Sequence, residues 1–311
     1  SELTRVVAVT SEGHLTLASP LARSFPRPVV ANVTRLITSD VSLKHLTVQG
    51  AVPLSVMETY GFAAEDCRFL ADTNLAYPNI VTPLLCNTMR SFRFVCNEIG
   101  SVGPGHVGTE LPQRNSQDGL FAENTFRLTS LGFGEYGAHW RFLRNHLWLY
   151  PNPQTAVAIS ISGLDVVFAE NDVHCEKLSG GEGWGAVLSD FYAPDDYAPY
   201  IGRNRVTDNT FDCELAGAYC IRMQSRDPVV ARNHLRVRGA GAAIRLDGVD
   251  VAATVTDNNI TVDTGAGILL EGGGHDTSTV SGNHIAATNG TMGVHVASPS
   301  QDQRIEQNTI A

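Results

Sequence analysis

The stretch Val255-Thr256-Asp257-Asn258-Asn259-Ile260 decides the fold, because its pattern returns at a fixed interval along the chain. Each copy has an apolar residue, two or three further residues, an asparagine, one residue and another apolar residue. The clearest copies are 24 or 25 residues apart and centre on Asn209, Asn233, Asn258, Asn283 and Asn308. Looser copies lie upstream, at Asn97, Asn124, Asn145 and Asn171, with weaker versions at Asp66 and His45. Such a period predicts a solenoid, whose repeats bury their apolar faces against one another.

The residues around each asparagine alternate between apolar and polar, which is typical of strands with one buried face. A second short alternating segment follows about eleven residues later and opens with glycine or alanine, as in Ala242–Leu246 and Ala266–Leu270. Two or three short strands per repeat predict a parallel β-helix. We expect the asparagine to stand at a corner in the left-handed backbone conformation and to bond its equivalents above and below in a ladder.

This repeat resembles the right-handed parallel β-helix repeat of the pectin-lyase-like superfamily, and the resemblance covers most of the chain. It implies an all-β fold in which residues 1–311 form one single-stranded, right-handed parallel β-helix domain of roughly ten to eleven coils. At about 4.8 Å per coil the rod is on the order of 50 Å long. The superfamily contains lyases, hydrolases, epimerases, phage tailspikes and adhesins, so the resemblance indicates a fold and leaves the function open.

The composition limits the classes of partner. A formal charge of −10 and a pI near 5.4 argue against nucleic acid, which favours a basic face. No run of about twenty apolar residues exists, so no membrane-spanning segment is predicted. Of the 22 basic residues only Lys44 and Lys177 are lysine, a bias typical of GC-rich bacterial genomes. This bias favours a bacterial or phage-associated protein, and the resemblance to the pectin-lyase-like superfamily implies that it is extracellular or lies on the cell surface.

Two of the six cysteines stand at equivalent places in neighbouring repeats. Cys175 and Cys213 each follow their asparagine by four residues, the position that Val237 and Val262 occupy in later repeats. Both are therefore expected inside the solenoid, one above the other. Stacked buried thiols are the favoured interpretation, and a disulfide is the alternative if the side-chain geometry allows it.

Insertions interrupt the repeat near residues 100–118 and 176–200. The second is the larger, because Asn171 and Asn209 are 38 residues apart. Aromatic rings stack on sugar faces and carboxylates bind hydroxyl groups, so this insertion is a candidate wall of a sugar-binding site; the alternative is a surface loop that covers the helix. The candidate substrate-binding residues are Trp184, Tyr192, Asp195, Asp196 and Tyr197 of this insertion, together with His295 on a later strand.

The outer face of the second strand carries the candidate catalytic residues. Alternation predicts one outward row of Ser160, Leu188, Arg222, Arg245, Leu269 and His295. It predicts a second row of Ser162, Asp190, Gln224, Asp247, Glu271 and Ala297. In the superfamily that the repeat resembles, the catalytic groove follows this strand.

Two interpretations of these rows remain open: a surface lattice of salt bridges, and an active groove. In a lyase or epimerase, Arg222 and Arg245 would neutralise an enolate-like intermediate, and His295 or Tyr192 would carry protons. In a hydrolase, Asp190 would pair with Asp247 or Glu271 as acid and base or nucleophile.

A rival outward face follows the asparagines. Its first column is predicted to hold His146, Asp172, Thr210, His234, Asn259 and His284. Its second column is predicted to hold Trp148, His174, Asp212, Arg236 and Thr261. His174, Asp212 and Arg236 fall on three successive coils and form an alternative site for proton transfer.

The function expected from these observations is action on a polysaccharide, as a lyase or epimerase of an acidic polymer. A non-catalytic rod resembling a tailspike or adhesin is the alternative, and a glycoside hydrolase with paired carboxylates is third. No cofactor is identified, and calcium is kept as a candidate metal. Because neither end shows a capping segment, we expect a part of a longer polypeptide or ends covered by another chain or domain. A homotrimer is kept as a candidate assembly.

Overall fold

The structure is a computed structural model, and it describes seventeen segments of the chain. The described residues are 6–9, 15–17, 38–74, 81–102, 108–113, 116–133, 137–150, 157–161, 163–179, 186–190, 202–216, 219–239, 241–247, 252–271, 277–288, 292–297 and 303–311.

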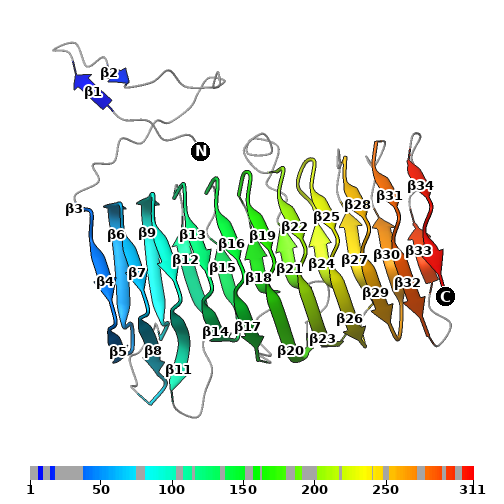
Figure 1. The fold of residues 1–311 in the computed structure, drawn as a ribbon, viewed down its shortest axis with the longest axis horizontal. Helices are drawn as coiled ribbons and strands as arrows, with labels where there is room; N and C mark the ends of the chain where they lie inside the picture. Colours follow the sequence, from blue (N-terminus) through cyan, green and yellow to red (C-terminus); the bar gives the residue numbers. More distant parts are fainter. Residues whose placement is uncertain are drawn as a thin grey trace.

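From β3 onward, the chain winds through three parallel sheets of eleven strands each (Figure 1). Successive strands in the sequence belong to different sheets, and each strand pairs with its equivalents one coil before and one coil after. The predicted all-β parallel β-helix is confirmed. Regular structure in the described segments consists of strands alone.

Sheet I precedes the repeating asparagines. Its strands are β4 (Ser42–Lys44), β7 (Ala63–Glu65), β10 (Arg93–Val95), β13 (Leu120–Ala122), β16 (Arg141–Leu143), β19 (Val167–Ala169), β22 (Arg205–Thr207), β25 (Val229–Ala231), β28 (Thr254–Thr256), β31 (Thr279–Ser281) and β34 (Arg304–Glu306).

Sheet II follows the asparagines. Its strands are β5 (Thr47–Gly50), β8 (Arg68–Asp72), β11 (Glu98–Val102), β14 (Thr125–Leu128), β17 (His146–Leu149), β20 (Asp172–Ser179), β23 (Thr210–Ala216), β26 (His234–Arg238), β29 (Asn259–Val262), β32 (His284–Ala287) and β35 (Thr309–Ile310).

Sheet III completes each coil. Its strands are β3 (Thr38–Ser39), β6 (Leu54–Tyr60), β9 (Leu84–Arg90), β12 (Thr109–Gln113), β15 (Leu131–Phe133), β18 (Val157–Ile161), β21 (Ala186–Asp190), β24 (Tyr219–Met223), β27 (Ala242–Asp247), β30 (Ala266–Glu271) and β33 (Met292–Val296).

Two parts of the chain depart from the sequence-based expectation. The first strands, β1 (Val6–Val9) and β2 (Leu15–Leu17), pair antiparallel with each other instead of forming parallel coils. The break expected near residues 100–118 is partly regular, because β12 pairs in parallel with β9 and β15 in sheet III.

The asparagine ladder runs unbroken from Asn97 to Asn308. At each step the side-chain amide donates to the Oδ1 atom of the asparagine on the next coil, over 2.9–3.0 Å. Each Oδ1 atom also accepts the backbone N–H of the preceding asparagine. Before the ladder, the N–H of Cys67 donates to Asn97 in the same way. The predicted ladder is therefore confirmed.

The left-handed residue at this corner is the one before the asparagine, which corrects the expectation above. These residues have φ between +51° and +67° and are His45, Asp66, Cys96, Glu123, Arg144, Glu170, Asp208, Arg232, Asp257, Gly282 and Gln307. Asp66 and His45 thus stand one place before the ladder position, which Cys67 and Leu46 occupy in their coils. The sharp bend at the preceding residue turns the asparagine side chain inward, where it can bond along the solenoid axis.

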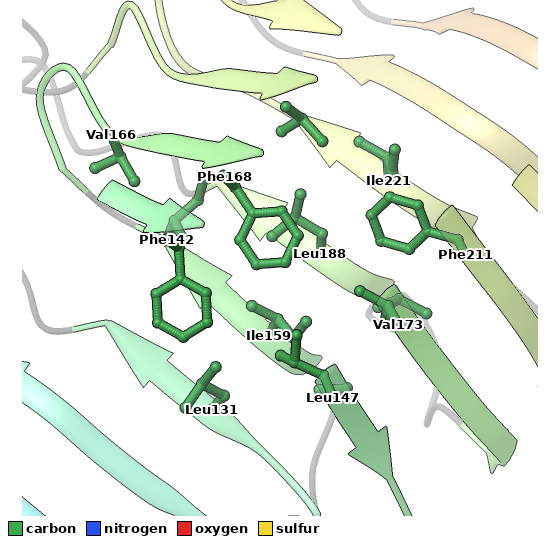
Figure 2. Packing of buried hydrophobic residues seen from close by; sticks show 14 of the residues in the cluster. Leu131, Phe142, Leu147, Ile159, Val166, Phe168, Val173, Leu188, Phe211 and Ile221 are labelled. Atoms are coloured by element: carbon green, nitrogen blue, oxygen red, sulfur yellow. The ribbon is translucent and has the colours of Figure 1, made fainter. Parts of the chain in front are cut away.

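The interior is filled by apolar side chains stacked in register. Phe94, Phe121, Phe142 and Phe168 occupy one position on successive strands of sheet I, with ring centroids 5.0–5.6 Å apart. Figure 2 shows Phe168 beside Phe211, and Phe142 and Phe168 among the aliphatic side chains of the other sheets. Each such ring contributes about 1.5–3 kcal/mol through burial, so every coil contributes to one continuous core.

Candidate functional site

Arg222 and Arg245 lie side by side on sheet III, as predicted. They are register partners on β24 and β27, and Asp247 and Glu271 are partners on β27 and β30. The Arg222 guanidinium binds both Asp247 oxygens, with contacts of 2.8–3.0 Å. Arg245 contacts Asp247 at 3.0 Å and Glu271 at 2.9 Å. The Asp247 carboxylate thus bridges the two cations and Glu271 binds Arg245, which is the arrangement expected of a salt-bridge lattice.

Tyr219 is part of this cluster, although strand alternation did not predict it there. Its hydroxyl accepts a hydrogen bond of 2.9 Å from Arg222, and both guanidinium groups lie 5.3 Å from its ring centroid. Burial raises the pKa of Tyr219, against the lowering effect of Arg222. Tyr219 is completely buried and Arg222 is 9% exposed, so the centre of the cluster is closed to a polymer in this conformation. The only sequence feature that could have pointed to Tyr219 was its position at the start of the second strand, three residues before Arg222.

Asp190 does not belong to the outward row, which corrects the predicted site. Its register partner on β18 is Ile161, a core residue, and Asp190 itself is completely buried. Ser189, and not Leu188, is the partner of Arg222. A shift of one residue moves every side chain of a strand to the opposite face, and the long insertion between the asparagines concealed this shift.

The Asp190 carboxylate binds groups at the end of the next coil. It accepts hydrogen bonds from the backbone N–H groups of Gln224 and Ser225, from the Ser225 hydroxyl and from the Asn204 amide. Burial raises the pKa of Asp190 to about 6, in opposition to these hydrogen bonds, which lower it. Asp190 therefore cannot pair with Asp247 or Glu271, and the predicted hydrolase dyads that include it are excluded.

Most of the predicted sugar-binding wall falls outside the described residues. This is true of Trp184, Tyr192, Asp195, Asp196 and Tyr197. His295 is described: it is partly exposed on β33 and continues the row of Arg245 through Leu269.

The predicted columns on sheet II are confirmed. Trp148, His174, Asp212, Arg236 and Thr261 are successive register partners on β17, β20, β23, β26 and β29. The neighbouring column runs His146, Asp172, Thr210, His234, Asn259 and His284. His174, Asp212 and Arg236 are therefore brought together as expected.

Trp148 is the prominent apolar group of this face. It is 40% exposed, and its ring centroid lies 4.9 Å from that of His174, with the planes tilted by 58°. Asp212, on the next coil beyond His174, binds Arg238 through a contact of 2.8 Å. Arg236 is exposed. We call Trp148, His174, Asp212 and Arg236 the sheet II platform: an open aromatic surface continued by charged groups at the spacing of the coils.

No arrangement of three or more histidine, cysteine or acidic residues able to hold a metal ion occurs within the described segments. In the same segments, no helix has the length and apolar character needed to cross a membrane.

With the coils, ladder and register established, the class of protein follows from the fold. The chain is a parallel β-helix repeat protein. The family model described as periplasmic copper-binding protein (NosD) matches residues 169–311, somewhat less than half of the chain. No curated protein sequence matches it.

Solved β-helix structures are distantly similar. The surface protein and adhesin PfbA of Streptococcus pneumoniae has 11% identity and a TM-score of 0.39, over 88% of this chain and 67% of that chain. The siphovirus 9NA tailspike receptor binding domain has 13% identity and a TM-score of 0.35, over 88% of this chain and 73% of that chain. Alginate lyase from Paenibacillus sp. str. FPU-7 has 11% identity and a TM-score of 0.37, over 85% of this chain and 99% of that chain.

Proposed function

We propose that this parallel β-helix binds a polysaccharide along the outer face of sheet II, with the sheet II platform as the contact surface. One observation carries the proposal: Trp148 is 40% exposed and lies against His174, in line with Asp212 and Arg236 on the following coils. An aromatic ring left open to water supplies a flat apolar face for a sugar ring. The carboxylate of Asp212 and the guanidinium of Arg236, two and three coils further along, supply charge-assisted hydrogen bonds to hydroxyl or carboxyl groups.

The regularity of the surface favours a polymer over a single sugar. Strands of neighbouring coils are about 4.8 Å apart, so equivalent side chains recur in a line along the rod. An extended chain can touch several coils at once, and weak contacts add along its length. A bacterial or phage protein with this property would act outside the cytoplasm, where such polymers are found.

The test is a binding panel of pectate, alginate, glucuronans and neutral glucans, measured by affinity electrophoresis. We expect at least one polymer to be bound, and Trp148→Ala to weaken that binding by roughly tenfold or more, since tenfold corresponds to about 1.4 kcal/mol. Tyr60→Ala is the matched control, because Tyr60 is 44% exposed on sheet III, away from the platform. Equal affinity of Trp148→Ala and the unaltered protein would exclude the platform.

A second candidate function is lyase or epimerase chemistry on an acidic polysaccharide at the Arg222 and Arg245 cluster. The contact of the Tyr219 hydroxyl with Arg222 favours it, because a phenol beside a guanidinium can exchange a proton while the cation neutralises a carboxylate. The burial of Tyr219 and Arg222 counts against this activity, because a polymer could reach them only after a conformational opening of the cluster.

Ultraviolet absorbance of unsaturated products, recorded together with new reducing ends, separates this chemistry from binding alone. Lyase activity predicts rising absorbance on an acidic polymer that Tyr219→Phe abolishes. Retained activity in Tyr219→Phe would remove the phenol from the mechanism. Absence of both signals, together with binding, would leave the platform as the functional surface.

A further inference from the structure

Two thiols of neighbouring coils meet inside the solenoid. Cys175 on β20 and Cys213 on β23 are register partners, as the sequence analysis predicted, and both are buried. Their Sγ atoms are 3.1 Å apart. A third buried thiol, Cys220 on β24, lies within interaction reach of Cys213. The structure describes all of these cysteines in the reduced form.

The backbone is compatible with a covalent link between the first two. Paired residues on adjacent strands of a sheet have Cα atoms about 5 Å apart, inside the range of roughly 4.4–6.8 Å found for disulfides. Both side chains point to the interior from paired positions of their strands, and the Sγ atoms, 3.1 Å apart, must approach by about 1 Å to reach the S–S distance of roughly 2.05 Å. Leu149 and Val237 occupy the same position in the coils on either side, so the position tolerates a range of side chains.

We propose that Cys175 and Cys213 are a modification site that forms an intramolecular disulfide when the protein folds in an oxidising environment. The oxidant is an external disulfide of the glutathione class. One thiolate attacks it, forms a mixed disulfide and releases one reduced thiol. The second cysteine thiolate then displaces the other reduced thiol, so that two cysteine protons are lost and two electrons pass to the oxidant.

The reaction belongs to folding and not to the finished solenoid. The thiolate is the attacking species. Burial raises the pKa of the Cys175 and Cys220 thiols well above the ordinary range, so in the folded state only Cys213 could supply a thiolate, because against its own burial the hydrogen bonds from the other two thiols lower its pKa to about 6. The folded cluster also lacks contact with solvent, since Cys175 and Cys213 are at most 1% exposed. Oxidation therefore takes place before these coils close or during a local opening.

A disulfide between Cys175 and Cys213 would stabilise the longest of the repeats between ladder asparagines. The ladder asparagines of these two coils are 38 residues apart, against 24 or 25 in later coils. Closing a longer loop costs more chain entropy, so a cross-link across it removes more freedom from the unfolded state.

The experiment refolds the whole chain in a buffer of reduced and oxidised glutathione, unfolds the product in urea with iodoacetamide so that buried free thiols are also blocked, and maps the peptides by mass spectrometry. The expected result is a peptide pair joined through Cys175 and Cys213, two hydrogen atoms lighter than the separate peptides, with the other four cysteines blocked. A link between Cys213 and Cys220, any other pairing, or six blocked cysteines would overturn the proposal.

A thermal comparison supplies the second measurement. The oxidised protein is expected to unfold at a higher temperature than the reduced protein, and Cys213→Val should abolish this difference. Valine is chosen because Val237 occupies the equivalent position on the next coil. Cys175→Ala should abolish it as well, which covers the case that one variant fails to fold. Cys86→Ala is the matched control: Cys86 is completely buried on β9, and its loss should leave the difference unchanged. A difference that persists in both Cys213→Val and Cys175→Ala would overturn the assignment.

Discussion

At the scale of single residues, the ladder asparagines hold neighbouring coils together by satisfying backbone groups as well as one another. Asn209 illustrates the pattern. Its amide donates to Phe168 O and to Asn233 Oδ1, and its own Oδ1 accepts the backbone and side-chain N–H groups of Asn171. All of these groups are buried, so no water replaces a lost partner. A hydrogen bond of modest net value therefore becomes costly to remove.

Asn209→Ala is accordingly expected to lower the free energy of unfolding by about 3 kcal/mol or more, since it leaves several buried donors and acceptors without partners. Urea unfolding followed by circular dichroism measures the change. Asn308→Ala is the matched control. It breaks the same kinds of bond at a position where the side chain is partly exposed in this structure, so that water can replace the lost partners. Equal losses for the two variants would contradict the argument from burial.

Asp190 gives a pH dependence with a definite sign. Its pKa is about 6 in the folded protein and 3.8 in its ordinary state, so the folded state holds the proton more tightly. Its contribution to stability is therefore complete at low pH and is lost as pH rises through about 6. Between pH of about 4 and 7, the unaltered protein should lose roughly 2 kcal/mol relative to Asp190→Asn, which has no carboxylate to titrate. Parallel pH profiles of the two proteins would show that Asp190 does not titrate in this range.

The ladder could be predicted from sequence because one polar residue at a fixed period has few structural explanations. The left-handed position could not, because the residues that fill it share no side-chain property. Asp208, Arg232 and Gly282 all adopt it. The bend is imposed by the coil and not by the intrinsic preference of each residue, although only glycine takes this conformation without cost.

At the scale of the strands, register decides which side chains can act together. The columns on sheet II were predictable because its strands follow the asparagines directly, which fixes their register. Sheet III was harder, since variable connections precede its strands. Cys220 and Ile221 are also both buried in succession, so simple alternation fails there. One residue of shift sufficed to move Asp190 from the predicted groove into the interior.

The ionic cluster on sheet III should behave as a structural unit. Asp247→Asn is expected to destabilise the protein by about 3–5 kcal/mol, because it leaves the nearly buried Arg222 without its main counter-charge. Glu271→Gln should cost at most about 1 kcal/mol, since Glu271 is 45% exposed where it meets Arg245. Chemical unfolding of both variants measures the two losses. A mild effect of Asp247→Asn would show that the cluster is held by other contacts.

At the scale of the whole molecule, the solenoid presents different chemistry on two of its faces. On sheet III, the charged groups around Tyr219 are engaged with one another and largely closed. On sheet II, an aromatic group and charged side chains are exposed along successive coils. Since every coil adds the same step to the rod, a surface of this kind can contact an extended polymer over several repeats. This difference in exposure is the reason for assigning binding to sheet II.

Hydroxyl-radical footprinting tests this central claim most directly, because it reports the solvent exposure of individual side chains. The protein would be labelled with and without the polysaccharide that it binds best. We predict that the polymer protects Trp148 and His174, while Met57 and Tyr60, which are exposed on sheet III, react equally in both samples. Protection of the sheet III residues with Trp148 and His174 unchanged would contradict the account.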